Sequence, residues 1–131
     1  MKFITPKIHS YIDYLMSALL LFFPWIFGKE LQGPDAWIPF VAGITILTFT
    51  ILTRFRHEHF GIIPIRTHLI GDIIIGLAIA ASPWYSVFTQ MSGTLHIVVG
   101  LAIVVVAILT DSDPSSGRIK VEPGQRQKLH E

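Results

Sequence analysis

Residues 7–25 read KIHSYIDYLMSALLLFFPW, and residues 66–84 read RTHLIGDIIIGLAIAASPW. Both stretches follow the pattern Lys/Arg-x-His-x3-Asp-x10-Pro-Trp without an insertion, and they lie 59 residues apart. Each stretch begins a long apolar run, which is typical of a membrane helix. Repetition inside one chain indicates that the shared positions were retained after an internal duplication. The pattern therefore predicts a duplicated membrane hairpin.

Composition also favours a membrane protein. Hydrophobic residues make up 51% of the 131 residues and charged residues only 15%, and the charges cluster between long uncharged stretches. A helix needs about 20 apolar residues to cross a hydrocarbon core of about 30 Å. Four segments approach that length, at 8–27, 37–53, 67–87 and 94–110. We predict an all-α membrane protein with four transmembrane helices. The absence of cysteine excludes disulfides and thiolate metal sites.

The duplication continues into the second helix of each hairpin. Residues 43–53 read GITILTFTILT, and residues 100–110 read GLAIVVVAILT. Each repeat thus holds two spans, so the tandem copies share one orientation and a pseudo-two-fold axis along the membrane normal relates them. The predicted parts are a first hairpin at 1–53, a cytoplasmic interfacial connection at 54–66, a second hairpin at 67–110 and a disordered cytoplasmic tail at 111–131.

The basic residues predict how the chain is oriented in the membrane. Nine of the ten lysines and arginines precede the first span, lie between the second and third spans, or follow the fourth, and only Lys29 lies on the other side. Because cytoplasmic loops carry an excess of lysine and arginine, both termini and the central connection are predicted to be cytoplasmic. The Pro-Trp pairs then lie at the outer interface, where tryptophans anchor helices at headgroup level.

The repeated polar residues lie on one stripe of each helix. His9 and Asp13 are four residues apart, so they lie one helical turn apart on the same face, and the second copy repeats this spacing. An ionised aspartate that faced lipid would cost about 2.5 to 3.5 kcal/mol at the bilayer centre, so the stripe is predicted to face protein. The return helices bring a threonine to similar depth. The candidate polar or ion site therefore comprises His9, Asp13, His68, Asp72, Thr53 and Thr110.

Three interpretations of these polar residues stay open. The first is a hydrogen-bonded clamp that holds each hairpin together, in which the aspartate is satisfied by the threonine of its own hairpin, by its own histidine or by backbone groups near the helix start. The second applies if the two copies meet on the pseudo-axis, where two imidazoles and two carboxylates could bind a divalent metal such as zinc or iron. The third is a proton or ion path, since His and Asp are typical relay groups inside membranes. The sequence fixes neither the helix order nor whether the first and third helices touch.

The Pro-Trp positions carry a resemblance to a known family. The first copy ends in Phe23-Pro24-Trp25 and the second in Ser82-Pro83-Trp84. These paired hairpins resemble the SPW-repeat family of small prokaryotic integral membrane proteins over nearly the whole chain except the tail. The resemblance implies the two-hairpin architecture and a prokaryotic cytoplasmic (inner) membrane, and it implies no activity. Phe23 stands where the motif has serine, which suggests that the hydroxyl is dispensable in that copy.

These observations favour a structural or interaction role over an enzyme. The chain is small and shows no phosphate-binding or nucleophile motif. We expect it to assemble with itself or with a larger membrane complex, to bind no nucleic acid and to need no cofactor. One alternative is an ion or proton transporter or channel module that uses the four His and Asp residues. A second alternative is a metal-binding membrane enzyme that holds a divalent ion on the same four residues.

Two further histidine-containing features are expected to be structural. His57 and His59 flank Glu58 in the central connection, and this group is interpreted as a solvated loop cluster. His96 lies near the outer start of the fourth predicted helix, and it is interpreted as an interfacial residue.

Overall fold

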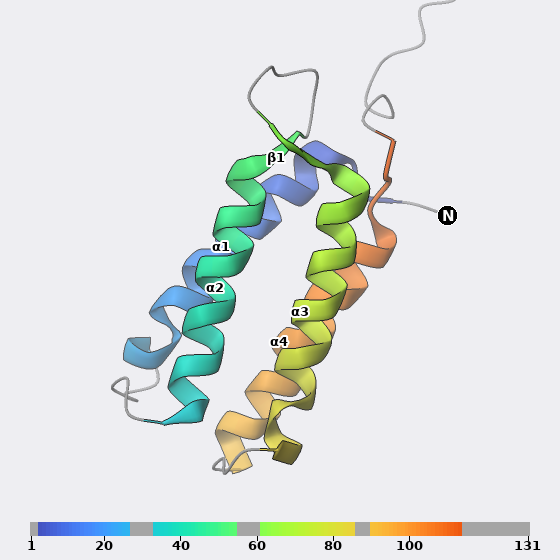
Figure 1. Ribbon diagram of the computed structural model, residues 1–131. Coiled ribbons are helices and arrows are strands. Elements are labelled where there is room, and N and C mark those ends of the chain that lie inside the picture. The colour runs from blue at the N-terminus through green and yellow to red at the C-terminus, as the bar shows by residue number, and fades with distance from the viewer. Residues whose placement is uncertain (1–2, 27–32, 55–60, 86–89, 114–131) are drawn as a thin grey trace, which may run out of the picture.

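The computed structural model describes residues 3–26, 33–54, 61–85 and 90–113, and the following description is confined to them. Four helices form an elongated bundle: α1 (Pro6–Ile26), α2 (Pro34–Leu52), α3 (Ile65–Tyr85) and α4 (Gln90–Leu109) (Figure 1). Two strands of two residues each, β1 (Thr53–Arg54) and β2 (Ile63–Pro64), lie between α2 and α3. The prediction of an all-helical fold is confirmed.

The helices begin two to four residues earlier than the sequence pattern suggests. Proline explains two of these starts, because α1 begins at Pro6 and α2 at Pro34. The first turn of a helix leaves its N–H groups unbonded, so proline, which lacks one, fits there without loss. At the other ends, Pro24 and Pro83 lie inside their helices, so each Pro-Trp pair is part of the last helical turn.

The surface of the bundle suits a lipid environment. Three helices are long and apolar enough to cross a membrane: Pro34–Leu52, Ile65–Tyr85 and Met91–Leu109. The helix α1 is as long as α3, but it carries Lys7, His9 and Asp13 in its first turns and is not among these three. Large apolar side chains point outward from all four helices, among them Leu15, Val41, Ile74 and Val98. The structure therefore supports a membrane protein with three candidate spans.

Each hairpin packs closely, α1 against α2 and α3 against α4. Glycines at matching positions of the two repeats allow this approach. A Cβ atom added to Gly43 would lie 2.9 Å from the backbone nitrogen of Leu21, and one added to Gly100 would lie 2.5 Å from that of Ala80. Both distances are shorter than van der Waals contact, so a side chain at either position would push the helices apart.

Apolar residues from all four helices meet in the middle of the bundle. This core comprises Leu20, Ala42, Ile46, Ile79 and Ile103. At one end, backbone hydrogen bonds join the hairpins in two matching places. β1 pairs in parallel with β2, with Thr53 opposite Ile63, and Ile4 forms a parallel bridge with Thr110. In both places the end of one hairpin pairs with the segment that leads into the other.

Candidate functional site

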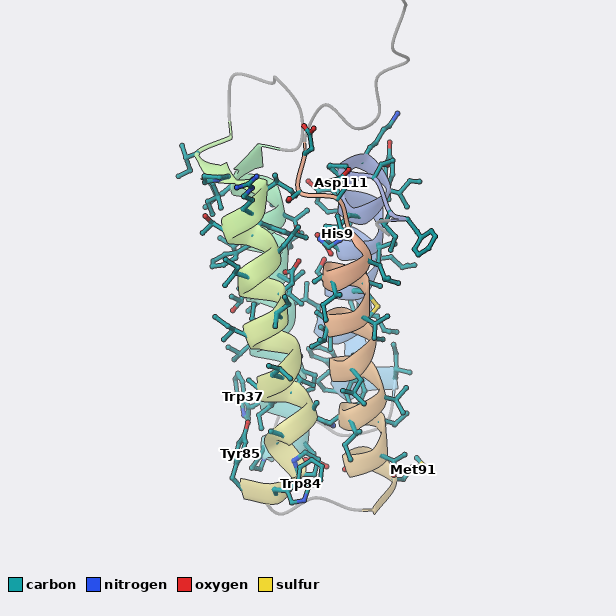
Figure 2. The ribbon with its side chains drawn as sticks, turned by 90° about the vertical axis from the view of Figure 1, so that its right-hand side faces the viewer. His9, Trp37, Trp84, Tyr85, Met91 and Asp111 are labelled. Atoms are coloured by element: carbon teal, nitrogen blue, oxygen red, sulfur yellow. The ribbon has the colours of Figure 1, made fainter. Side chains whose placement is uncertain are left out.

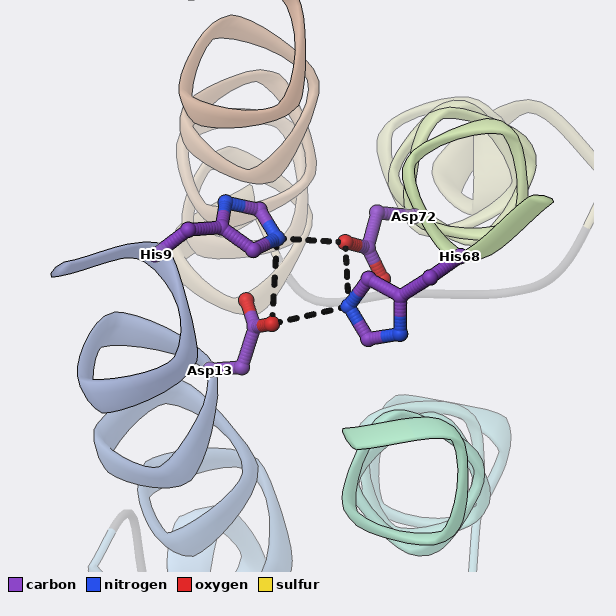
Figure 3. Close-up of side chains that lie close together, drawn as sticks. All are labelled: His9, Asp13, His68 and Asp72. Carbon is purple, nitrogen blue, oxygen red and sulfur yellow. Dashed lines mark hydrogen bonds and ion pairs between the residues drawn. The ribbon is translucent and has the colours of Figure 1, made fainter. Parts of the chain in front are cut away.

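Four polar side chains from α1 and α3 converge inside the bundle, near the end where the strands lie. The Nε2 atom of His9 lies 3.0 Å from Oδ2 of Asp13 and 3.0 Å from Oδ2 of Asp72. The Nε2 atom of His68 lies 2.9 Å from Oδ2 of Asp13 and 3.1 Å from Oδ2 of Asp72. These four atoms form a closed ring in which nitrogen and oxygen alternate (Figure 3). We call these four residues the His–Asp ring.

The order of the helices around the bundle explains how the ring closes. Viewed along the bundle, the helices follow one another as α1, α2, α3 and α4, so α1 and α3 lie on a diagonal (Figure 3). The spacing of four residues in each of these helices directs its histidine and aspartate to the same side. The two stripes therefore face each other across the centre, and the imidazoles meet edge to face with centroids 5.5 Å apart.

Two threonines hold the other nitrogen of each imidazole. Nδ1 of His9 lies 2.9 Å from Oγ1 of Thr110, and Nδ1 of His68 lies 2.8 Å from Oγ1 of Thr53. Each threonine donates its hydroxyl hydrogen to the carbonyl four residues earlier, at 2.7 Å for Thr110 and 2.5 Å for Thr53. A hydroxyl has one hydrogen, so it accepts a hydrogen bond from the imidazole. Both histidines consequently carry a proton on Nδ1.

The threonine contacts cross between the hairpins. Thr53 ends the first hairpin and contacts His68 of the second, while Thr110 ends the second and contacts His9 of the first. The prediction that each hairpin uses its own threonine is therefore wrong, whereas each aspartate does lie beside the histidine of its own helix. The reason is the backbone pairing at this end, because β2 leads directly into α3 and β1 places Thr53 beside it. The bridge between Ile4 and Thr110 does the same for α1.

The ring and its threonines are shielded from their surroundings. All six side chains are buried, with residue exposures between 0% and 6%. Oδ1 of Asp72 accepts no hydrogen bond from any residue that the structure describes. A cavity of about 30 Å³ lies beside Asp13, lined otherwise by apolar side chains of α1, α2 and α4. This volume is sufficient for a single water molecule.

The four side chains of the ring could hold a metal ion. Each offers one ligand atom, and these atoms all lie within 4.8 Å of one another. Neutral imidazole and carboxylate are ordinary ligands of zinc and of other first-row transition metals. The sequence interpretation of a shared set of two imidazoles and two carboxylates thus has the geometry that it requires.

Comparison with known families adds the identity of the repeat. The model of the SPW repeat domain matches residues 7–110. The chain belongs to the SPW repeat domain family. The match includes both Pro-Trp hairpins and extends to the threonine that ends the second one. No curated protein and no solved structure matches the chain. The resemblance noted from the sequence is confirmed for this SPW protein.

The residues that give the SPW family its name lie far from the ring. Trp84 lies at one end of the bundle, while His9 lies toward the other (Figure 2). The tryptophans of the two motifs are exposed, Trp25 at 57% and Trp84 at 76%. Ser82 is buried and donates its hydroxyl to the carbonyl of Ile79 within its own helix, at 2.6 Å. The motif serine of this SPW repeat therefore makes a local bond and does not reach the site.

A second polar group, near the Pro-Trp end, was not recognised from the sequence. His96 was expected at the interface, but it is buried in the bundle, where its Nδ1 atom donates to the carbonyl of Ser92 at 2.7 Å. Its ring packs edge to face on Phe23, and the hydroxyl of Ser92 donates to Asp35 at 3.3 Å. The steps of four residues from Ser92 to His96 and Gly100 could have indicated a buried stripe. His57 and His59 lie outside the described residues.

Proposed function

We propose that this SPW repeat protein is a small structural or interaction protein of the membrane, in which the His–Asp ring clamps the two hairpins together. The observation that carries the proposal is the reach of each histidine. His9 contacts Asp72 and Thr110 of the second hairpin, and His68 contacts Asp13 and Thr53 of the first. Each of these two histidines thus joins one hairpin to the other through two side chains.

In a lipid environment, a polar clamp can stabilise the association of helices. Lipid tails are as apolar as leucine, so helices in a membrane gain little from hydrophobic contact and associate through close packing and polar bonds. Close packing holds the two helices of each hairpin, at Gly43 and Gly100. The contact between hairpins is less extensive and relies mainly on α2 against α3. The ring supplies polar contacts where the packing between hairpins is sparse.

We further propose that all four helices span an inner membrane of a prokaryote, as two tandem hairpins in one orientation. The 21 residues of α1 extend for about 31 Å at 1.5 Å per residue, which matches a hydrocarbon core of about 30 Å. Its His9 and Asp13 face the ring and not the lipid, so they do not oppose insertion. Lys7 and Arg66 lie in the first turns of α1 and α3, at the ring end, and together with the excess of basic residues predicted for the termini and the central connection they favour cytoplasmic termini.

Association with a second copy or with a larger membrane complex completes the proposal. Four helices that present apolar side chains on every side bury little surface of their own, which favours contact with further helices. The mass of the purified protein in mild detergent, measured by light scattering, tests self-association. A protein that is monomeric in detergent and in nanodiscs, and that co-purifies with no other membrane protein, would remove this part of the proposal.

The clamp is tested by removing only its hydroxyls. Thr110→Val and Thr53→Val keep the side-chain shape and leave a buried Nδ1–H without an acceptor, which should cost about 1 kcal/mol each. Thr48→Val is the matched control, because Thr48 donates to the carbonyl of Ile44 and is exposed. Thermal unfolding in detergent measures the difference. If the three variants unfold alike, the threonine contacts do not hold the hairpins together.

One observation supports a second candidate, a proton or ion module. The cavity beside Asp13 has the volume of one water molecule and adjoins the ring, as a path from the ring would require. Asp35 and His96 lie in the first halves of α2 and α4, toward the end opposite the ring, and place ionisable groups in that half of the bundle. This candidate predicts that Asp13→Asn abolishes ion or proton flux in liposomes while the protein stays folded. Equal flux in the variant and the original chain would exclude it.

A further inference from the structure

We propose that the His–Asp ring binds one divalent transition metal ion of the zinc class as a structural centre. The ligands are Nε2 of His9 and His68 and one carboxylate oxygen each of Asp13 and Asp72. This inference rests on the proposed clamp and deepens it, since the metal would join the hairpins at the point where their polar side chains meet.

The first argument is the direction of the histidine lone pairs. Both Nδ1–H groups donate to threonine hydroxyls, whose own hydrogens are used by backbone carbonyls. In a neutral imidazole the remaining lone pair lies on Nε2, which in both residues faces the ring. Histidines that ligate metals typically donate their other nitrogen in this way, which fixes the tautomer and the orientation of the ring.

The second argument is charge. With neutral histidines, all four atoms of the ring are acceptors, and each nitrogen lies about 3 Å from two oxygens. Such an arrangement needs positive charge among the four atoms, supplied either by a proton on each Nε2, as in the clamp, or by a metal cation that replaces those two protons. A divalent cation balances the two carboxylates and leaves a neutral centre, which a buried site inside a membrane bundle requires. Outside α1 and α3, the polar side chains that contact the ring among the described residues are Thr53 of β1 and Thr110, which follows α4.

The third argument is size. The contacts around the ring measure 2.9 to 3.1 Å, so a point in the middle lies roughly 2 Å from each atom, as zinc does from nitrogen and oxygen ligands. Mg²⁺ and Ca²⁺ suit the site less well, because they prefer six or more oxygen ligands. The unbonded Oδ1 of Asp72 is a further oxygen that could turn toward the ion.

The ligand count indicates what the ion does. Four ligands supplied by protein are the usual number for a structural zinc site, whereas a catalytic zinc keeps a position open for water. Burial of all four residues of the ring agrees with a closed site. The ion would therefore stabilise the bundle, and this reading argues against the metal-dependent enzyme that the sequence left open.

The test measures metal content and binding in the full chain. The protein is purified in mild detergent, stripped with a chelator and titrated with Zn²⁺ by calorimetry and with Co²⁺ by visible absorption. We expect one ion per chain and the strong visible absorption of four-coordinate Co²⁺. We also expect a melting temperature that falls on chelation and recovers on adding Zn²⁺. A folded chain that takes up neither ion, or that takes up an ion without any change in melting temperature, overturns the proposal.

Three variants locate the site. Asp13→Asn should abolish stoichiometric binding, while Thr110→Val keeps all four ligands and should weaken binding 10- to 100-fold by loss of the outer hydrogen bond. The double variant His57→Ala/His59→Ala controls for the loop histidines and should bind as the original chain does. Binding that survives Asp13→Asn but is lost in the loop variant overturns the proposal. If Asp13→Asn does not fold, Thr110→Val alone decides between the two locations.

The results separate the metal from the clamp. If no ion binds and the threonine variants still lower stability, the clamp stands and the metal proposal fails. If an ion binds to the ring and the threonine variants leave stability in the metal-free state unchanged, the side chains alone do not clamp the hairpins, and the metal performs that task.

Discussion

The two ends of the bundle use the same duplicated framework in different ways. At the strand end, the residues of the ring and its two threonines are identical in the two repeats, and the side-chain contacts of His9 with both aspartates and a threonine are repeated by His68. At the Pro-Trp end, a hydrogen bond joins Asp35 of the first repeat to Ser92 of the second, and the two residues are 57 positions apart. These are matching positions of the repeats, but they now hold different side chains.

The difference shows which end tolerates change. The ring needs two histidines and two aspartates at once, because each of its atoms contacts two others. A change in one copy would leave buried polar atoms without partners in both hairpins, which is costly in a low-dielectric interior. At the other end, a serine and an aspartate can replace one another as long as one donates and one accepts. Substitutions at the two ends should therefore differ in cost.

The largest difference in lost stability is expected between Asp72 in the ring and Asp35 at the Pro-Trp end. Asp72→Asn removes a buried carboxylate that contacts both histidines and should cost about 3 kcal/mol or more, as for a broken buried ion pair. Asp35→Asn changes a carboxylate that is only partly buried and accepts from Ser92, so it should cost less than about 1 kcal/mol. Unfolding in detergent, followed by circular dichroism, gives both values. Equal losses would mean that the ring is no more important than the opposite end.

A smaller difference is expected between two buried histidines. His68→Gln loses its contacts with two carboxylates and Thr53, and it should cost about 2 kcal/mol. His96→Gln loses one bond to a backbone carbonyl and an edge-to-face contact with Phe23, and it should cost about 1 kcal/mol. The melting temperatures of the two variants, compared at the same detergent concentration, test the order. A less stable His96 variant would reverse the comparison.

The sequence predicts the helices well because the apolar runs are long and proline marks their starts. It also predicts that the polar stripe faces protein, since the cost of exposing Asp13 to lipid is large. The helix order could not be predicted, because a pair of hairpins can pack in either sense and no local pattern distinguishes the two arrangements. The order became clear only from the diagonal position of α1 and α3.

The threonine partners of the ring could not be predicted from local sequence patterns. The spacing of His9 and Asp13 along one helix is local and indicates a shared face. The contact between Thr110 and His9 joins residues 101 positions apart and depends on the pairing of Ile4 with Thr110. Two-residue strands have no periodicity, so no sequence pattern could have assigned each threonine to the opposite hairpin. His96 was misplaced for a related reason, because it has no matching histidine in the first repeat.

A third, weaker effect concerns the bond that links α2 and α4 at the Pro-Trp end. Ser92→Ala removes one side-chain hydrogen bond of 3.3 Å and should cost about 0.6 kcal/mol, the average for such contacts between membrane helices. Thr110→Val at the ring end is the comparison, since it also removes one hydroxyl, and we expect a larger loss there. Unfolding by denaturant in mixed micelles resolves this difference. A larger loss for Ser92→Ala would show that polar contacts matter equally at both ends.

The smallest effect is expected at the motif serine itself. Ser82 donates only within its own helix, to the carbonyl of Ile79, so Ser82→Ala should cost less than about 0.6 kcal/mol. The matching residue in the first repeat is Phe23, which is buried against His96, and Phe23→Ala should cost about 3 kcal/mol through the lost packing. The free energies of unfolding of the two variants, measured under the same conditions, test whether this motif position contributes differently to stability in the two repeats. Because a local hydroxyl bond and a buried aromatic ring both fit there, the Pro-Trp end can vary in sequence while the pairing of the hairpins at the ring stays the same. A Ser82→Ala variant as unstable as the Phe23→Ala variant would contradict this view, and it would place a structural requirement on the serine that its single intrahelical bond does not explain.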